Sequence, residues 1–432
     1  MAGYEDFVDF SYKPAKTDMI VSFRVGVPGW ETKKRAWGAV ASESSVGTWA
    51  KVVGLKYEHV KKVAAKVFWA GKDGWIKIAY PVDHFEYGNM AQILASIAGN
   101  DFGMKAVSSL RLQDVKWPAK IIKAHPGPQF GIKGIRKIFG VKKRPLMLSV
   151  PKPKVGMTTK EHAQIGYDIW TGGLDLLKDD ENLSNQKFNP FEKRVKLSLK
   201  MRDKAEKETG EKKSYLINVT APTTDEMLRR AKFVAREGGE YAMIDVITSG
   251  WTSVRTLREH CADLGLAIHA HRAFHGAFDR NPKHGFSNLE VGEVVRLLGV
   301  DQYHIGTHIG KMVSPKHEVL DVQEHITQQI VKENPKEHCL SEDWLNMKNV
   351  FPVASGGLQP GLIPQMIDLL GTEIMLQLGG GVHGHPKGSH AGAVAMRAAL
   401  EAKLDGVSLE TASKTCKALQ QAMDYWGYTR PR

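Results

Sequence analysis

The chain has 432 residues, 42% of them hydrophobic and 25% charged, which is typical of a globular protein and too long for one ordinary core, so two domains are expected. It shows no apolar run of ~20 residues that could span a membrane and no signal peptide, and its three separated cysteines favour a reducing cytoplasm. The net charge of +13 comes mostly from residues 101–160, with 14 Lys and Arg against 2 acids; because no nucleic-acid motif accompanies it, we interpret it as a solvated basic face.

Residues 1–126 are expected to form a domain of mixed α and β structure. Its apolar patterns predict strands at residues 19–25, 76–80 and 106–117, and a helix at residues 90–97. Pro126-Gly127-Pro128 interrupts these patterns, so we place the domain boundary there and assign residues 127–432 to a second domain.

The second domain repeats one unit, a short apolar strand followed by an amphipathic helix. Eight strands are predicted, at residues 146–152, 174–180, 215–220, 241–248, 266–271, 302–306, 350–355 and 374–378. Capping boxes open several of the helices, at Thr158, Thr223 and Ser287. Alternating βα units give parallel strands, so we predict an α/β fold with a (β/α)8 TIM barrel. A doubly wound open sheet is the alternative, but its glycine-rich dinucleotide fingerprint is missing after the first strand.

The stretch from Gly172 to Glu181 combines a strand-length apolar run with a lysine that three acids follow directly. In a strand, Lys178 and Asp180 would share one face and Asp179 would point to the other. Carboxylates gathered at a strand end suit a hard cation such as Mg²⁺. Lys178 is either a salt-bridge partner of these acids or a lysine that takes up CO₂ as a carbamate, and the residues alone leave both interpretations open.

Active sites of TIM barrels lie at the C-terminal ends of the strands, and here those ends are rich in reactive side chains. Besides the Lys178 stretch, they carry Lys152, Lys154, His269, His271, Arg272, His304, Ser355-Gly356-Gly357 and Gly379-Gly380-Gly381. Glycine-rich strand ends let backbone N–H groups approach an anion, so a bisphosphorylated sugar is a fitting substrate. Residues 306–311, which end in Lys311, are interpreted as a lid that closes over the substrate.

Several motifs together resemble one family. They are residues 43–49 (ESSVGTW), 98–100 (AGN), 152–154 (KPK), 172–182, 269–273 (HAHRA), 310–311, 355–357 and 379–381. In these motifs the chain resembles the large, catalytic subunit of ribulose-1,5-bisphosphate carboxylase/oxygenase (Rubisco), nearest its archaeal form III branch, over nearly the whole sequence. The resemblance implies a lyase with a ferredoxin-like N-terminal domain before the barrel.

What the resemblance implies for the chemistry is Mg²⁺-dependent enolisation of ribulose 1,5-bisphosphate and CO₂ addition, giving two 3-phosphoglycerates, with O₂ as a competing substrate. Lys178, as a carbamate formed from activator CO₂, would hold Mg²⁺ together with Asp180 and Glu181. The catalytic residues would be Lys152, Lys178, His271 and Lys311. The substrate-binding residues would be Glu43, Thr48, Trp49, Asn100, Lys154, Arg272, His304, Ser355, Gly356, Gly357, Gly379 and Gly380.

In the family, the residues matching Glu43, Thr48, Trp49 and Asn100 reach the site from the partner's N-terminal domain. A homodimer or a ring of dimers with shared sites is therefore expected, without a small subunit, nucleic acid or membrane. Pathway context, in nucleotide salvage or in a methanogen carbon-fixing pentose-phosphate route, is not determined by the sequence.

Two departures from the family pattern are visible. Met312-Val313-Ser314-Pro315 follows the lid lysine where the family has Leu or Met and then Glu-Gly, and Val150 stands where many members have a phosphate-binding Thr. The alternative function is a Rubisco-like enolase or isomerase of sulfur salvage. Such proteins usually replace the residues matching Asn100, His271 and Lys311, which are all present here, so we favour the carboxylase.

Overall fold

The structure is a computed structural model that describes residues 3–48, 52, 54 and 57–430. The described residues pack as two compact units. The N-terminal unit comprises the described parts of residues 1–127, 274–298 and 328–347, and the barrel unit those of 128–273, 299–327 and 348–432. Two later segments thus pack with the N-terminal unit, and the division into domains between residues 126 and 127 stays a prediction.

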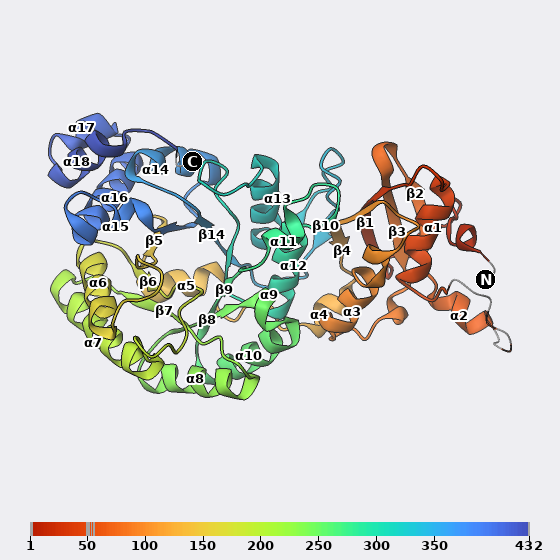
Figure 1. Cartoon of the computed structure of the whole chain (residues 1–432), viewed down its shortest axis with the longest axis horizontal. Coiled ribbons are helices and arrows are strands. Elements are labelled where there is room, and N and C mark those ends of the chain that lie inside the picture. The colour runs from red at the N-terminus through yellow and green to blue at the C-terminus, as the bar shows by residue number, and fades with distance from the viewer. Residues whose placement is uncertain (1–2, 49–51, 53, 55–56, 431–432) are drawn as a thin grey trace. The chain divides into compact units, whose positions relative to one another are not determined.

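The N-terminal unit is built on an antiparallel sheet with the strand order β4-β1-β3-β2 (Figure 1). Its main elements follow the order βαββαβ: β1 Met19–Gly26, α1 Lys33–Glu43, β2 Lys66–Ala70, β3 Trp75–Tyr80, α3 Met90–Ile97 and β4 Ser109–Lys116. This is the ferredoxin-like topology. The predicted strands and helix are confirmed, whereas α1 and β2 had no predicted counterpart.

Shorter elements complete this unit. They are η1 Tyr4–Phe7, α2 Tyr57–Val63, η2 Lys72–Gly74, η3 Val82–His84, η4 Asn100–Gly103, α4 Ala119–Ala124, α11 Gly276–Asp279, β10 Gly285–Phe286, α12 Asn288–Leu298, β12 Ile330–Val331 and β13 Glu342–Asp343. β10 pairs in parallel with β4 and adds a fifth strand to the sheet, so a late segment of the chain belongs to this unit by backbone hydrogen bonds.

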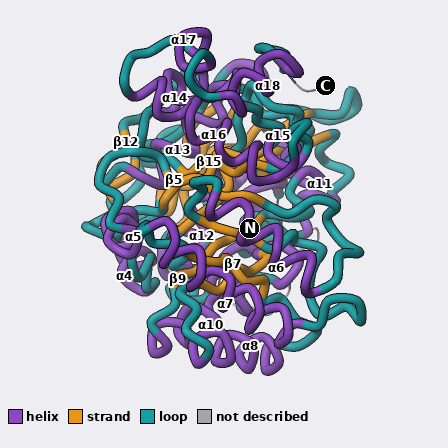
Figure 2. Tube along the Cα trace, turned by 90° about the vertical axis from the view of Figure 1, so that its left-hand side faces the viewer, coloured by secondary structure: helices purple, strands orange, loops and turns teal. Residues whose placement is uncertain are grey.

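The barrel unit contains, within its described residues, a closed barrel of eight parallel strands in the order β11-β14-β15-β5-β6-β7-β8-β9. Their bounds are β5 Leu146–Ser149, β6 Leu176–Lys178, β7 Ser214–Asn218, β8 Tyr241–Asp245, β9 Ala267–His271, β11 Gln302–His304, β14 Phe351–Ser355 and β15 Met375–Leu378. All eight predicted strands are present, which confirms the TIM barrel and excludes the open sheet. Figure 2 shows these strands enclosed by helices.

The barrel helices are α5 Gly131–Phe139, α6 Thr159–Thr171, α7 Phe191–Thr209, α8 Thr224–Arg236, α9 Val246–Ser249, α10 Trp251–Leu264, α13 Lys316–Thr327, η5 Pro360–Leu362, α14 Ile363–Leu370, α15 Gly380–His383, α16 Gly388–Leu404, α17 Leu409–Ser413 and α18 Lys417–Trp426. The predicted capping box of α6 is present, because Thr158 and Glu161 each accept a hydrogen bond from the other's backbone N–H. Across the described residues we find no helix with the length and apolar character needed to cross a membrane.

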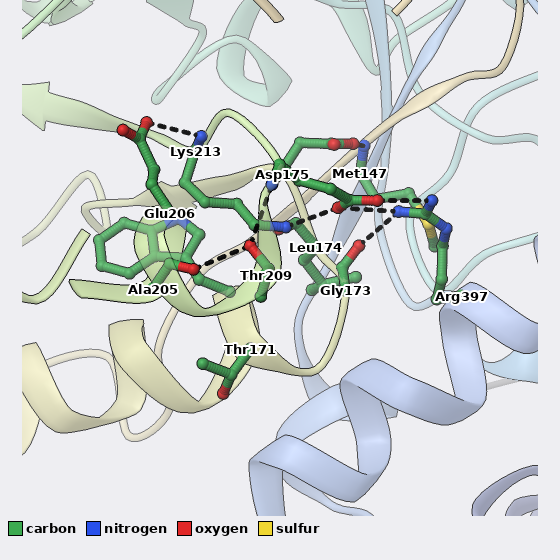
Figure 3. A network of polar contacts seen from close by, with 12 residues as sticks. Met147, Thr171, Gly173, Leu174, Asp175, Ala205, Glu206, Thr209, Lys213 and Arg397 are labelled. Carbon is green, nitrogen blue, oxygen red and sulfur yellow. Dashed lines mark hydrogen bonds and ion pairs between the residues drawn. The ribbon is translucent and has the colours of Figure 1, made fainter. Parts of the chain in front are cut away.

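The strand starts of the barrel are held together by buried charges (Figure 3). Asp175 precedes β6 and accepts two hydrogen bonds from the guanidinium of Arg144, at 2.7 and 2.6 Å, and a third from the N–H of Met147 at 2.8 Å. Lys213 donates to the carbonyl of Leu174 at 3.0 Å. The starts of β5, β6 and β7 are thereby fixed to one another before the strands enter the apolar core.

That core consists of side chains from the strands and from α5, and its members are buried: Ile132, Ile135, Phe139, Leu146, Leu148, Leu176, Leu216, Tyr241, Ala267, Phe351, Val353 and Met375. The strand interiors therefore stabilise the fold through apolar burial, and the two ends of the barrel are free to carry polar groups.

We expect Asp175→Asn to lower the free energy of unfolding by about 3 kcal/mol, because it removes a buried carboxylate and leaves the partly buried guanidinium of Arg144 without it. Urea denaturation followed by circular dichroism measures this. As a matched control, Glu259→Gln removes the exposed ion pair with Arg255 and should change stability by less than about 0.5 kcal/mol. An equal small effect of both substitutions would contradict the role of the Asp175 network.

A second prediction concerns Asp101, which is fully buried in the N-terminal unit. Burial raises the pKa of its carboxyl to about 8, although the N–H groups of residues 99, 101 and 102 approach it without hydrogen bonds of normal geometry. The folded protein therefore binds a proton that the unfolded chain, with a pKa near 3.8, releases. Stability must then fall as pH rises from about 4 to 8, by up to about 1.4 kcal/mol per pH unit from this group.

Asp101→Asn should remove this contribution, so that stability decreases less steeply with rising pH, because the amide does not titrate. Thermal unfolding at pH 5, 6, 7 and 8 tests it against the parent and against Asp73→Asn, which changes an exposed aspartate of the same unit. If Asp101→Asn and the parent lose stability with the same pH slope, the buried acid is not the titrating group.

Candidate active site

The reactive side chains of the barrel unit gather at the C-terminal ends of its strands, as the sequence predicts. Lys178 ends β6, His271 ends β9, His304 ends β11 and Ser355 ends β14. Because the strands are parallel and form one closed barrel, these four ends lie on one rim. Asp245 ends β8 in the same way and belongs to this rim, although sequence reasoning did not single it out.

Lys178 is fully buried and faces carboxylates. Its Nζ lies 3.9 Å from Oε2 of Glu181 and donates a hydrogen bond to the carbonyl of Asp179 at 2.9 Å. Burial lowers the pKa of the Lys178 ammonium, and the negative charges of Glu181 and Asp245 oppose this only in part. A buried lysine of lowered pKa can lose its proton more readily than one in water, and the neutral amine is a nucleophile.

Asp180 is held in its ionised form beside Lys178. Its Oδ2 accepts a hydrogen bond from Nζ of Lys152 at 2.9 Å, and its Oδ1 accepts one from the side chain of Asn182 at 2.8 Å. Burial acts to raise the pKa of Asp180, but these two donors outweigh it and the pKa lies below its ordinary value. Asp180 and Glu181 therefore supply carboxylate oxygens next to the amine of Lys178.

Asp179 points to the opposite face, as the strand alternation predicts. It is fully buried between β6 and the surrounding helices, where the guanidinium of Arg194 lies 3.3 Å away. The hydroxyl of Tyr215 donates to Oδ1, and the N–H of Asn218 donates to Oδ2 at 3.0 Å. His162 stands 3.4 Å from the same carboxylate. Asp179 is thus an anchor for the strand end and does not face the site.

His271 lies between two carboxylates of the rim. Its Nε2 is 3.5 Å from Oε2 of Glu181, and its Nδ1 is 3.1 Å from Oδ1 of Asp245. Burial raises the pKa of Asp245 to about 7 against the charge of Lys178. The imidazole thus lies between the Glu181 carboxylate and a second acid, and its Nδ1 also accepts a hydrogen bond from the N–H of Ala273 at 3.1 Å.

A row of hydrogen bonds crosses the barrel interior from Tyr241 to Ser355. Gln302 donates to Tyr241 at 3.1 Å and accepts from Nδ1 of His269 at 2.8 Å. Nε2 of His269 and Nε2 of His304 are 2.9 Å apart, and Nδ1 of His304 is 2.8 Å from the hydroxyl of Ser355. Burial lowers the pKa of His269 to about 3 and that of His304 well below its ordinary value, so both imidazoles are neutral.

Neutral imidazoles give this row one direction. If Nδ1–H of His269 donates to Gln302, its Nε2 must accept from His304, whose Nδ1 then accepts from Ser355. The hydroxyl of Ser355 therefore donates inward and can only accept from a ligand. Both ring nitrogens of His304 already have partners, so its predicted contact with a phosphate stays a prediction and would require Ser355 to move.

The predicted lid lies directly on the end of β14. The N–H of Lys311 donates to the carbonyl of Gly356 at 3.0 Å. A Cβ on Gly310 would stand 1.6 Å from that carbonyl oxygen, so only glycine permits the approach. The side chains of Lys311, Met312 and Val313 are exposed. At the lid's base, the hydroxyl of Ser314 would meet a Cβ on Gly306 at 2.8 Å.

Several other predicted site residues lie outside this group of strand-end side chains. Glu43 is the last residue of α1 and Asn100 the first of η4, both in the N-terminal unit with the exposed Thr48. Trp49 lies outside the described residues. Lys154 is exposed on the loop after β5. Their roles in the site stay predictions.

Comparison with known proteins identifies relatives along the whole chain. Residues 131–426 match the family model described as the catalytic domain of the ribulose bisphosphate carboxylase large chain, and residues 6–121 match its N-terminal domain. A ribulose bisphosphate carboxylase of Methanosarcina mazei is 46% identical over 98% of this chain and 99% of its own. One from Pyrococcus furiosus is 48% identical over 99% of each.

Solved structures agree with these relatives. A dimeric archaeal Rubisco from Hyperthermus butylicus superposes with a TM-score of 0.93 at 45% identity, covering 99% of this chain and 100% of that one. An octameric ribulose-1,5-bisphosphate carboxylase/oxygenase from Pyrococcus horikoshii, in complex with sulfate ion, gives 0.92 at 45% identity, covering 99% and 98%.

Proposed function

The chain belongs to the family of ribulose bisphosphate carboxylase large chains, and from that premise we propose that it binds Mg²⁺ and carboxylates ribulose 1,5-bisphosphate to two molecules of 3-phosphoglycerate. The observation that carries the proposal is the buried amine of Lys178 beside Asp180 and Glu181 at the C-terminal end of β6. O₂ is proposed as the competing substrate. The two family models support a division into an N-terminal domain, residues 1–126, and a catalytic domain, residues 127–432.

Activation begins at Lys178. After the ammonium has released one proton, its neutral amine attacks the carbon of CO₂; a C–N bond forms as one C=O π bond opens onto oxygen, and the nitrogen releases a second proton, which leaves an anionic carbamate. The lowered pKa of Lys178 supports this step, because a larger fraction of the amine is neutral near pH 7. The product carries two oxygens, which together with those of Asp180 and Glu181 make a set of hard anionic ligands.

These residues fit Mg²⁺, because the structure gathers oxygen donors around a lysine whose surroundings favour the neutral amine. Bound there, Mg²⁺ would polarise the substrate's C2 carbonyl and C3 hydroxyl, so that the C3 proton becomes removable. Lys178 in its carboxylated form then offers an oxygen that accepts this proton. Lys152, which contacts Asp180, stands close enough to the same centre to return a proton later in the reaction.

Substrate orientation is proposed to come from the glycine-rich strand ends and the polar row. Gly357, Gly379 and Gly380 would bind one phosphate of the substrate. Arg272 would bind the other. Ser355 would accept a hydrogen bond from a substrate hydroxyl, as the direction of the row from His304 requires. Lys311, carried by the lid, would steady the new carboxylate.

We further propose a homo-oligomer with shared sites. The solved relatives are dimeric in one case and octameric in the other, which supports assembly from identical chains. In such an assembly Glu43, Thr48, Trp49 and Asn100 of one chain would complete the site of its partner.

The proposal is tested by supplying ribulose 1,5-bisphosphate, Mg²⁺ and labelled bicarbonate to the purified protein without O₂. We expect acid-stable label in 3-phosphoglycerate, and none when Mg²⁺ is removed with a chelator. Substrate enolisation without labelled product would instead favour the enolase or isomerase of sulfur salvage, and the carboxylase proposal would then be wrong.

Two variants separate the steps of the reaction. Lys178→Ala should abolish both carboxylation and exchange of the substrate's C3 proton with solvent, by at least about 1000-fold, because the base and a metal ligand are lost together. Lys311→Ala should lose carboxylation by a similar factor yet keep part of the proton exchange, since the lid lysine acts after enolisation.

Lys160→Ala is the matched control, because it removes an exposed lysine of α6 and should leave both rates unchanged. Equal loss of proton exchange in the Lys178 and Lys311 variants would show that the lid lysine does not act at a separate, later step.

A further inference from the structure

The turn after β15 is fixed by hydrogen bonds to the carbonyl of Leu378, the last residue of the strand. β15 ends at Leu378, and the chain passes through Gly379 into the short helix α15, Gly380–His383. The carbonyl of Leu378 accepts two hydrogen bonds from the end of β5, from the N–H of Val150 at 3.1 Å and from the hydroxyl of Ser149 at 3.0 Å. The peptide group between Leu378 and Gly379 is therefore fixed from one side.

Fixing this carbonyl also fixes the amide that follows it. The peptide group is planar and trans, so the N–H of Gly379 points opposite to the carbonyl of Leu378. Because that carbonyl is turned toward β5, the Gly379 N–H is aimed away from β5. The direction of this amide decides whether it can donate to a phosphate on the side of the turn away from β5.

Ser149 is in turn held by His383. Nε2 of His383 lies 2.9 Å from the Ser149 hydroxyl, and Nδ1 lies 2.9 Å from the hydroxyl of Ser389 at the start of α16. The Ser149 proton is donated to Leu378, so its oxygen must accept from Nε2–H of His383. Nδ1 then accepts from the hydroxyl of Ser389.

The surroundings keep this relay in a single protonation state. Burial, together with the positive charge of Lys152, lowers the pKa of His383 to about 4 despite the opposing effect of the Val150 backbone, so the imidazole is neutral at physiological pH. A protonated ring would lose the acceptor that Ser389 needs. The neutral form is the one that the hydrogen bonds require.

Close packing restricts the C-terminal part of the turn. A Cβ on Gly381 would stand 2.2 Å from the carbonyl oxygen of Leu358, and one on Gly392 of α16 would stand 2.0 Å from that of Val382. A Cβ on Gly379 would meet Cε of Lys152 at 3.6 Å. The turn is thus packed against backbone at Gly381 and lies beside a proposed catalytic lysine at Gly379, whereas a Cβ on Gly380 would meet nothing within 4 Å.

We propose that His383 is a positioning residue that acts through Ser149 and Leu378 to aim the Gly379 amide at one phosphate of the substrate. The inference rests on the proposed function, which places a phosphate at this turn. Val150 stands where many family members have a phosphate-binding Thr, and the neighbouring Ser149 does not replace it. Ser149 donates its proton to the carbonyl of Leu378, so it supports the turn and does not itself donate to the phosphate.

The test compares steady-state kinetics of His383→Leu with the parent. Loss of the relay should raise KM for ribulose 1,5-bisphosphate about tenfold and change kcat less than about threefold, because the hydrogen bond that holds Ser149 is lost and no reacting group is removed. Ser149→Ala should give the same split, and the double variant should be no worse than either single one, since both act on one carbonyl. His383→Gln keeps a donor near the Nε2 position and should recover most of the parent KM.

His390→Leu is the matched control, because it removes an exposed histidine of the same helix that carries Ser389, and its KM should equal the parent value. The proposal is overturned if His383→Leu leaves KM unchanged, if kcat falls without a change in KM, or if Gln fails as badly as Leu. Should His383→Leu not fold, Ser149→Ala and His383→Gln decide by the same criteria.

Binding measured by calorimetry separates this inference from the proposed function. Inorganic phosphate is titrated into the parent, His383→Leu and His390→Leu, without turnover. A parent that binds phosphate but does not carboxylate would contradict the proposed function alone. A parent and a His383→Leu variant that bind phosphate equally would contradict the positioning role alone.

Discussion

The buried contact between Asp179 and Arg194 is the constraint from which the reactive end of the barrel follows. Both side chains are fully buried, with their charged groups 3.3 Å apart behind β6. An isolated buried charge would cost several kcal/mol, so this carboxylate can only stay where Arg194, Tyr215 and the Asn218 amide meet it. Since alternate residues of a strand face opposite sides, holding Asp179 outward obliges Lys178 and Asp180 to face the interior. The site is therefore oriented by buried residues on the opposite face of the strand.

Burial then gives the inward residues their chemistry. An ammonium enclosed without full compensation loses its proton more easily, and Lys178 has one carbonyl and nearby carboxylates for partners. The same burial keeps His269 and His304 neutral, and neutral imidazoles impose one direction on the hydrogen bonds that reach Ser355. One physical effect, removal of water from the barrel interior, thus prepares a nucleophilic amine at one strand end and a directed acceptor at another.

The sequence was sufficient for the barrel and for most of its rim, because buried parallel strands read as short apolar runs and their ends coincide with polar or glycine residues. Helix α1 left a weaker signal, since much of its buried face is made of Ala36, Gly38 and Ala39, which contribute little apolar contrast. Asp245 could have been found by the strand-end rule that found Lys178. The relay through His383 could not, because it depends on β5, β15 and α16 meeting in space, and no spacing along the chain encodes that meeting.

Helix α16 contacts both ends of the barrel, through residues that are bound to segments far apart in the sequence. Near its start, Ser389 donates to His383 and so supports the turn after β15. Two turns later, Arg397 donates to the carbonyl of Gly173 at 2.8 Å, next to Asp175 at the opposite end of β6 (Figure 3). At 1.5 Å per residue, the step of eight positions from Ser389 to Arg397 spans about 12 Å, a distance of the order of a barrel strand. A rigid helix fastened at both points therefore sets the height of the glycine turn relative to β6, and the network at the strand starts contributes to the geometry of the site as well as to the stability of the fold.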